Sequence, residues 1–403
     1  MRYTIGQLAE IIDGDRGKNY PKQDEFYPQG YCLFLNTGNV TKEGLIFEEN
    51  QFIMKEKDEA LRKGKLKRGD IVYTTRGTVG NAGYYNSSVP YENVRINSGM
   101  VILRSNGEIL DARFLYQILK SQYYRPYFKQ YCTGSAQPQL PIKNFSQIYL
   151  NVPDIKTQHR IADILSVYDD LIENNQRQIK LLEEAAQRLY KEWFVNLRFP
   201  GHENTKIVDG VPEGWQWCKV RDVADINSSA LPKNYKEDFI DYVDLGSVRC
   251  GHIETRTRYN LNEAPGRAKR CAKDGDIIWG MVRPNLKAYA LVTNPKETDV
   301  FSTGFAVLSA KKVPYSYLYC AVTQEEFVGY LVNATNGAAY PAVKPVHFEV
   351  ADILKPDDKV LEQFHSVADS IYRKKEALEN QNHNLRESRD LILPKLMSGE
   401  VEV

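Results

Sequence analysis

The chain has 403 residues, of which 42% are hydrophobic, and its formal net charge is +1. This length predicts two or three folded domains, and the near-neutral charge means that any basic surface must be local. Six scattered cysteines without a CxxC pair favour a reducing cytosol over a disulfide framework. With no signal-peptide pattern and no window of 18 apolar residues, we expect a cytoplasmic protein that does not span a membrane.

The first 155 residues carry the pattern of a globular domain. The pattern predicts two buried strands, a helix and a Gly-rich loop, which are, in chain order, Ile71–Thr75, Val101–Leu103, Asp111–Tyr131 and 133–140. A Gly69-Asp70 turn precedes the first of these strands.

A long helix is expected next, because apolar residues then recur in alternating steps of four and three. These residues are Ile161, Leu165, Tyr168, Ile172, Ile179, Leu182, Ala186, Leu189 and Trp193, with Asn175 as a polar member. Such a heptad seam is typical of a helix that packs lengthwise on another helix.

The segment 199–355 repeats the first domain in order. Its predicted strands, helix and loop are Ile277–Gly280, Ala306–Leu308, Tyr315–Val332 and 336–343, and Gly275-Asp276 is the equivalent turn. A repeat of this length indicates a duplicated domain. A second heptad seam follows, formed by Val360, Phe364, Val367, Ile371, Leu378, Leu385 and Ile392 with the polar members Lys374, Gln381 and Ser388.

Catalytic motifs of the common types are absent from the sequence. It has no GxxxxGK[ST] phosphate loop, no GxGxxG and no GxSxG, and its acidic residues are dispersed. Asp357 and Asp358 stand where the second long helix begins, so helix capping explains them better than catalysis does.

Basic residues cluster before both Gly-Asp turns. They are Arg62, Lys63, Lys65, Lys67 and Arg68 in the first copy and Arg267, Lys269, Arg270 and Lys273 in the second, of which Lys65, Lys67, Arg68, Lys269 and Arg270 are the predicted DNA contacts. A solvated surface would explain one such cluster, but its recurrence favours contacts with the phosphates of a nucleic acid.

Polar residues follow the same two strands in both copies. They are Thr75, Arg76 and Thr78 in the first copy and Arg283, Asn285 and Lys287 in the second. The later loops add Gln137 and Gln139, and Tyr340 and Lys344. Arginine, asparagine and lysine at strand ends suit the reading of base edges, while an ordinary polar loop is the other interpretation.

Four further stretches are distinctive, namely GSAQPQLPIKNFSQIYLNVPDIKTQHRIADIL at 134–165, LYKEWFVNLRFPG at 189–201, VPEGWQWCKVRDVADI at 211–226 and LRESRDLILPKLMSGEV at 385–401. With them, the sequence over its full length resembles the specificity subunits of type I restriction-modification systems. The resemblance implies an α+β protein with two homologous mixed α/β target-recognition domains, separated by two long helices that form an antiparallel coiled coil. The implied segments are the first target-recognition domain at 1–155, a central helix at 156–198, the second domain at 199–355 and a C-terminal helix at 356–403.

The resemblance also implies a function and partners. Each target-recognition domain is expected to bind one half of a bipartite, asymmetric site in double-stranded DNA, without catalysis. Two methyltransferase subunits and the restriction (translocase) subunits are the implied partners, and S-adenosylmethionine, Mg²⁺ and ATP are expected in those partners rather than in this chain. Two other hypotheses remain at this stage, namely a nuclease or methyltransferase with unrecognised motifs and a coiled-coil adaptor that binds only proteins.

Overall fold

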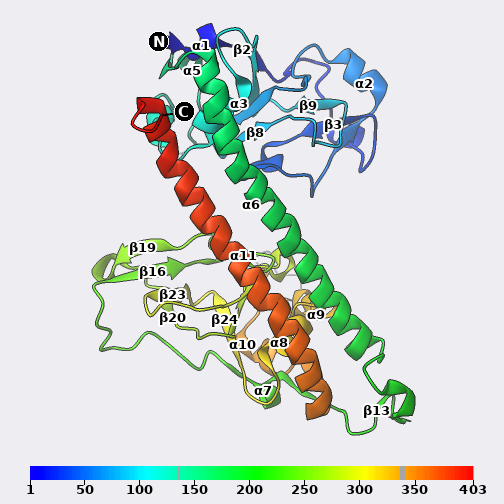
Figure 1. The fold of residues 1–403 in the computed structure, drawn as a ribbon. Coiled ribbons are helices and arrows are strands. Elements are labelled where there is room, and N and C mark those ends of the chain that lie inside the picture. The colour runs from blue at the N-terminus through cyan, green and yellow to red at the C-terminus, as the bar shows by residue number, and fades with distance from the viewer. Residues whose placement is uncertain (135–136, 336–340, 403) are drawn as a thin grey trace. The chain divides into compact units, whose positions relative to one another are not determined.

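The computed structural model of the protein describes residues 1–134, 137–335 and 341–402. The chain forms two compact units, the first from Met1–Asn174 and Gln381–Val403 and the second from Asn175–Asn380. Two long helices, α6 (Ile155–Tyr190) and α11 (Asp358–Ser398), each give one half to each unit (Figure 1).

A four-stranded antiparallel sheet lies at the centre of the first unit. Its strands, in hydrogen-bonding order, are β2 (Ala9–Asp13), β10 (Met100–Ser105), β7 (Ile71–Thr74) and β8 (Ala82–Tyr84). Side chains of a strand alternate between its two faces. Val101 and Leu103 therefore pack with helix residues such as Phe114, whereas Met100 and Ile102 pack against a second, smaller sheet.

The other elements of the first unit surround this sheet. The smaller sheet consists of β6 (Phe52–Ile53), β3 (Cys32–Leu35) and β9 (Val94–Ile96). Two strand pairs are β1 (Arg2–Thr4) with β11 (Tyr149–Asn151) and β4 (Val40–Thr41) with β5 (Gly44–Leu45). The helices are α1 (Ile5–Leu8), α2 (Lys55–Ala60), α3 (Ala112–Lys120), α4 (Arg125–Lys129) and α5 (Ile142–Ser146).

The second unit repeats the central sheet with the same strand order. Its strands are β15 (Ala224–Ile226), β24 (Phe305–Ala310), β21 (Ile277–Gly280) and β22 (Tyr289–Leu291). One face again packs on helices and the other on a smaller sheet. Within the described residues, the predicted duplication is thus visible in the topology of the two sheets.

The elements around the second central sheet differ more from those of the first unit. The smaller sheet has four strands, β19 (Thr257–Asn260), β16 (Phe239–Val243), β23 (Asp299–Ser302) and β20 (Ala268–Arg270). The strand pairs are β14 (Gln216–Lys219) with β25 (Asp352–Lys355), β17 (Val248–Arg249) with β18 (His252–Ile253), and β12 (Ile207–Val208) with β13 (Val211–Pro212). The helices are α7 (Val220–Val223), α8 (Tyr315–Val322), α9 (Glu325–Asn333) and α10 (Pro345–Glu349).

Each predicted domain helix is in fact two helices. The segment Asp111–Tyr131 forms α3 and α4, and Tyr315–Val332 forms α8 and most of α9. The break in the first copy falls at Ser121, whose extended backbone ends α3, and Pro126 then opens α4. Periodicity alone cannot place such a break, because proline is tolerated in the first turn of a new helix.

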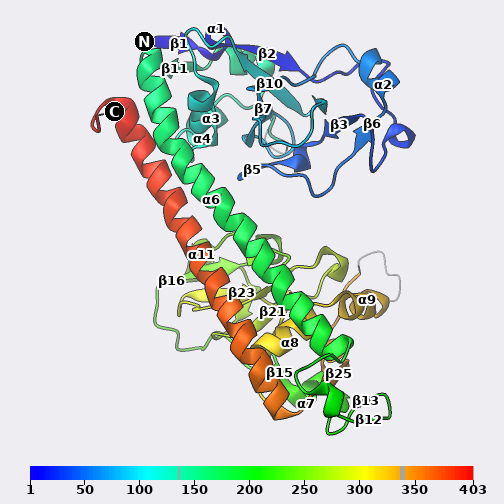
Figure 2. The ribbon, with the colours of Figure 1, turned by 45° about the vertical axis from the view of Figure 1, so that its right-hand side comes forward.

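The two long helices pack on each other in antiparallel fashion within each unit. In the first unit the beginning of α6, with Ile161 and Leu165, shares a core with Leu393 near the end of α11. In the second unit the end of α6, with Ala186, shares a core with Phe364 near the beginning of α11. Figure 2 shows the two helices side by side. Buried residues of α6 confirm most of its predicted seam, namely Ile161, Leu165, Ile172, Asn175, Ile179 and Ala186.

Six of the ten predicted contact positions on α11 are displaced by one residue, and the buried residues there are Ala368, Tyr372, Lys375, Asn382, Arg389 and Leu393. Val367 is 45% exposed, whereas the neighbouring Ala368 is fully buried. Lys375, and not Lys374, faces the core in the same way and is buried. Its ammonium group lies 2.7 Å from Glu183 of α6, and this pairing permits the burial of a lysine. The predicted contact positions were wrong here because they were chosen from the spacing of apolar residues alone. That spacing cannot indicate a lysine that is buried by an ion pair with the other helix.

The same correction applies to the end of α11 in the first unit. Arg389 is buried there in place of the predicted Ser388, and its guanidinium group lies 2.6 Å from Asp169 of α6. Lys120 of α3 contacts the same carboxylate at 3.0 Å. Burial alone would raise the pKa of Asp169, but Lys120 and Arg389 hold that pKa below its usual value.

None of the described helices combines the length and apolarity that a membrane crossing requires.

Candidate nucleic-acid interface

Three loops of the first unit meet where β7 ends. The amide of Thr75 donates to the carbonyl of Gly99 at 2.9 Å, and the amide of Leu140 donates to the carbonyl of Thr75 at 2.9 Å. Arg76 and Gln139 face each other as an isolated β-bridge. The loop after β7, the turn before β10 and the end of the 133–140 loop therefore form one surface, which we call the β7 surface.

The polar residues predicted for base contacts in the first copy lie on the β7 surface. Arg76, Thr78, Gln137 and Gln139 are all exposed there. Thr75 is only 4% exposed, and its hydroxyl donates to the Gly99 carbonyl at 3.1 Å. Thr75 therefore holds the loops together, while the other four residues present donors and acceptors to solvent.

The second unit builds an equivalent surface at the end of β21. The amide of Met281 donates to Gly304 at 2.9 Å, and the amide of Val343 donates to Met281 at 2.8 Å, which repeats the pattern around Thr75. Arg283 and Asn285 are exposed on this β21 surface. Lys344 is also exposed and precedes α10, whereas Tyr340 lies outside the described residues.

The loops after β7 and β21 turn in the same way with different residues. Gly77 and Gly80 have φ of 70° and 100° in the first unit. The backbone pairing places Arg283 and Lys287 at the corresponding positions of the second unit, with φ of 51° and 53°. A residue other than glycine costs about 1 kcal/mol or more in this left-handed region. The second unit thus accepts backbone strain and gains two long cationic side chains at its loop.

The predicted phosphate contacts of the first unit lie at the opposite end of β7. Lys67 and Arg68 line a surface cavity of about 450 Å³, together with His159 of α6 and the turn into α3. The four residues of β7 separate this cavity from Arg76 by on the order of 13 Å. The two groups that are adjacent in sequence therefore do not share one surface.

Two of these basic residues already have partners in the protein. Lys65 lies 2.5 Å from the buried carboxylate of Asp58, which Arg95 also contacts at 2.5 Å. Burial would raise the pKa of Asp58, but hydrogen bonds from Lys65 and Arg95 hold that pKa below its usual value. The guanidinium group of Arg68 donates to the carbonyl of Val89 at 2.9 Å and lies over a tyrosine ring. Lys65 and Arg68 thus stabilise the fold, and Lys67 is exposed to solvent.

The basic clusters of the two copies precede the same turn of each central sheet. The amides of Lys67 and Lys273 donate to Asp70 and Asp276 at 2.7 and 2.9 Å, so these two lysines correspond. Lys269 and Arg270 belong to β20, which pairs with β23, and Lys65 likewise forms a bridge with Arg95 of the equivalent strand β9. The basic segments before the two turns therefore lie beside corresponding strands, and their contact with phosphates stays a prediction.

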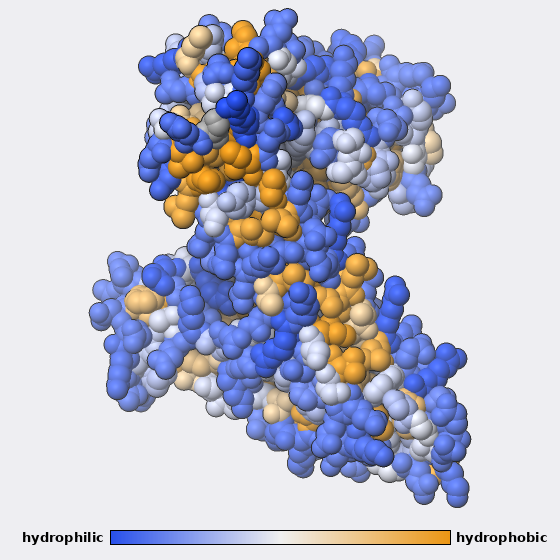
Figure 3. Space-filling view, in the orientation of Figure 1, coloured by the Kyte–Doolittle hydropathy of each residue, from blue (hydrophilic) through white to orange (hydrophobic). Residues whose placement is uncertain are grey.

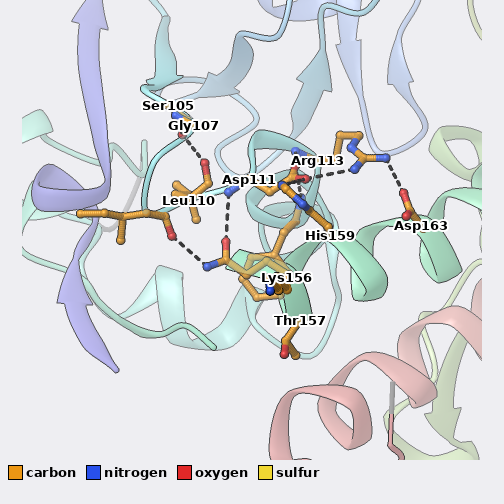
Figure 4. Close-up of polar contacts among 12 residues, drawn as sticks. Ser105, Gly107, Leu110, Asp111, Arg113, Lys156, Thr157, His159 and Asp163 are labelled. Carbon is orange, nitrogen blue, oxygen red and sulfur yellow. Dashed lines mark hydrogen bonds and ion pairs between the residues drawn. The ribbon is translucent and has the colours of Figure 1, made fainter. Parts of the chain in front are cut away.

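Helix α6 is fixed to the first unit by a buried glutamine. Gln158 is fully buried and accepts a hydrogen bond from the Asp111 amide at 3.0 Å. Its amide group donates to the carbonyl of Ile109 at 2.8 Å. Nearby, Arg113 pairs with Asp163 at 2.6 Å, as Figure 4 shows. These contacts set the orientation of α6 against the first unit.

Sequence reasoning missed two exposed residues beside these loops. Arg16 donates to the carbonyl of Ser98, in the turn that completes the β7 surface. Leu286 lies in the loop after β21 and is 59% exposed. Arg16 carried no motif, and an isolated leucine is normally assigned to a core, so neither residue gave a signal.

Within the described ranges, no group of His, Cys, Asp or Glu is arranged to hold a metal ion.

Comparisons with known proteins identify the class to which this fold belongs. Residues 1–184 match the model of the type I restriction modification DNA specificity domain. A crystal structure of a type I restriction-modification system S subunit from M. genitalium has the same fold, with a TM-score of 0.55 and 14% identity, and the alignment covers 98% of this chain and 95% of that one.

Two known specificity subunits are similar to this chain over most of its length. The MjaIX specificity subunit of Methanocaldococcus jannaschii is 25% identical over 86% of this chain and 81% of its own length. The HindI specificity subunit of Haemophilus influenzae is 23% identical over 98% of this chain and 100% of its own. The chain belongs to the specificity subunits of type I restriction-modification systems. As such it is a non-catalytic part of a type I complex and recognises DNA target sites.

Proposed function

We propose that each unit of this chain reads one half of a bipartite, asymmetric DNA site. The β7 surface reads one half and the β21 surface reads the other. The observation that carries this proposal is that the two surfaces share one backbone scaffold but present different side chains. A duplicated scaffold with different exposed residues is what two different half-sites require.

We infer the partners and the location of the protein from its family. The subunit recruits two methyltransferase subunits and the restriction subunits, which hold S-adenosylmethionine, Mg²⁺ and ATP, in the cytoplasm. Exposed apolar residues on α6 support this docking role, namely Val167 and Leu171 in the first unit and Leu181 in the second, with exposures of 56%, 42% and 64%. Figure 3 shows apolar surface over part of this helix. Such side chains on a solvated helix are typical of a protein-binding face.

Substitution of Arg76 tests the reading of bases by the β7 surface. Binding is measured with the full chain and its methyltransferase subunits on cognate DNA and on variants of each base pair. We expect Arg76→Ala to cost about 1–3 kcal/mol, and only at one base pair. Arg76→Lys is the matched control, because it keeps the charge but loses the bidentate geometry. Equal losses on cognate and scrambled DNA would show that Arg76 contacts no base.

Lys67 tests the predicted phosphate contact at the other end of β7. Lys67→Ala should weaken binding to every sequence and lower the slope of log affinity against log salt by about one. Lys65→Ala, by contrast, removes a partner of the buried Asp58, so it should lower the stability of the first unit as well. An unchanged salt slope for Lys67→Ala would show that the cavity lined by Lys67 does not contact the DNA backbone.

A further inference from the structure

The loop after β21 ends in a rigidly held apolar tip. The amide of Leu286 donates to the carbonyl of Arg283 at 2.8 Å, and the amide of Lys287 donates to Pro284 at 3.0 Å, which closes a turn around Asn285. Beyond the turn, the carbonyl of Lys287 accepts from the amide of Cys250 at 2.9 Å. The tip is therefore fixed before any ligand binds, and its leucine side chain is 59% exposed.

Further anchors hold the two sides of this tip. The ammonium group of Lys287 lies 2.5 Å from the carboxylate of Glu325, at the start of α9. Pro284 is buried beneath the turn, and the amide of Arg283 donates to the carbonyl of Pro341 at 2.8 Å. A leucine on such a support loses little freedom when it meets a partner, and preorganisation of this kind favours binding.

The exposure of Leu286 is not a consequence of the shared scaffold. In the first unit Val79 immediately precedes Gly80, as Leu286 precedes Lys287. Val79 packs against the main core of its unit, whereas Leu286 belongs to no buried cluster of the described residues. The second loop is also one residue longer between its two left-handed positions. The scaffold of the first unit thus packs Val79 against the core, whereas the equivalent loop of the second unit leaves Leu286 exposed.

The chemistry of the neighbouring residues indicates what the tip would meet. Arg283 and Asn285 are exposed beside Leu286, so the tip combines a cation, an amide and an apolar group. In the major groove only thymine presents a methyl group, and an aliphatic side chain distinguishes it from cytosine by contact with that methyl. We propose that Leu286 reads a thymine methyl group in the half-site of the second unit. This inference rests on the proposed function, because it requires the β21 surface to face DNA.

Replacing thymine with deoxyuridine tests the contact with a single-methyl change. Each thymine of the methylated site is replaced in turn, and binding of the full chain with its methyltransferase subunits is measured. One replacement should weaken the wild-type complex about fourfold, which corresponds to about 0.8 kcal/mol for one buried methyl group. The Leu286→Ala complex should bind the unmodified site about fourfold or more weakly, and it should no longer respond to that replacement.

Leu261→Ala is the matched control, since Leu261 is an exposed leucine of the same unit outside the loop. It should keep the wild-type response to deoxyuridine. Tryptophan fluorescence verifies that Leu286→Ala is folded, because all four tryptophans lie in the second unit. A site where no deoxyuridine weakens binding, or an equal response of Leu286→Ala, would overturn the assignment while specific DNA binding remained. A complex that does not prefer its site over scrambled DNA would instead refute the proposed function.

Discussion

A four-charge cluster in the second unit makes its stability depend on pH. His252, in the β18 strand, lies 2.7 Å from Glu379 of α11 and 3.4 Å from Glu183 of α6. Lys375 of α11 completes the cluster and donates to the carbonyl of Gly251 at 2.8 Å. Burial would lower the pKa of His252, but the hydrogen bonds to the two glutamates raise it to about 9. The strand is thus held on the two helices by a protonated imidazole.

The raised pKa fixes the direction and the size of the effect. Because the pKa of an unfolded histidine is about 6.5, the stabilisation is complete below pH 6.5 and is lost as the pH rises through about 9. The shift of roughly 2.5 units would correspond to about 3 kcal/mol for a group without solvent contact. The side chain is 38% exposed, so solvent screening reduces the expected contribution to about 1 kcal/mol.

Urea unfolding followed by tryptophan fluorescence measures this contribution selectively. The tryptophans, Trp193, Trp215, Trp217 and Trp279, all belong to the second unit. We expect His252→Gln to lower the free energy of unfolding by about 1 kcal/mol at pH 6 and to have little effect at pH 10. The control is His383→Gln, because His383 is 70% exposed and lies in the first unit. The same loss at both pH values would refute the assignment of a charged His252.

Two further substitutions test the helix contacts. Asp169→Ala leaves the buried Lys120 and Arg389 without their shared carboxylate, so the first unit should lose about 3–5 kcal/mol in hydrogen exchange while the tryptophan transition stays in place. The pKa of Asp169 lies below its usual value, so its stabilisation should persist at neutral pH and be lost only as the pH falls below about 3.8. Asp357 accepts from the amide of Val360 and caps α11, and Asp357→Ala should lower the stability of the second unit by about 1 kcal/mol in urea titrations.

The elements set by local physics could be predicted from the sequence. The Gly-Asp turns could be predicted because glycine and aspartate favour turns. In the structure, Asp70 and Asp276 each accept a hydrogen bond from the backbone amide three residues earlier. The buried strand behind each turn and the seam of α6 followed from apolar periodicity. The duplication was visible for the same reason, since both copies repeat these local signals in order.

The features set by contacts between distant residues could not be predicted in this way. Lys375 and Arg389 look like surface residues in the sequence, and only the acidic partners on α6 explain their burial. The separation of Lys67 from Arg76 follows from the course of β7 through the core, which sequence adjacency conceals. The exposure of Leu286 could not be predicted, because the sequence alone does not show whether a single apolar residue is buried.

The most direct test of the account is the methylation pattern in cells that express this chain with its methyltransferase subunits. Sequencing that detects methylated bases should find one bipartite motif, which disappears when the gene is deleted. Arg76→Ala should relax the motif in one half only, and Leu286→Ala in the other half only. Changes in the same half for both substitutions, or a motif that survives deletion of the gene, would contradict the assignment of one half-site to each unit.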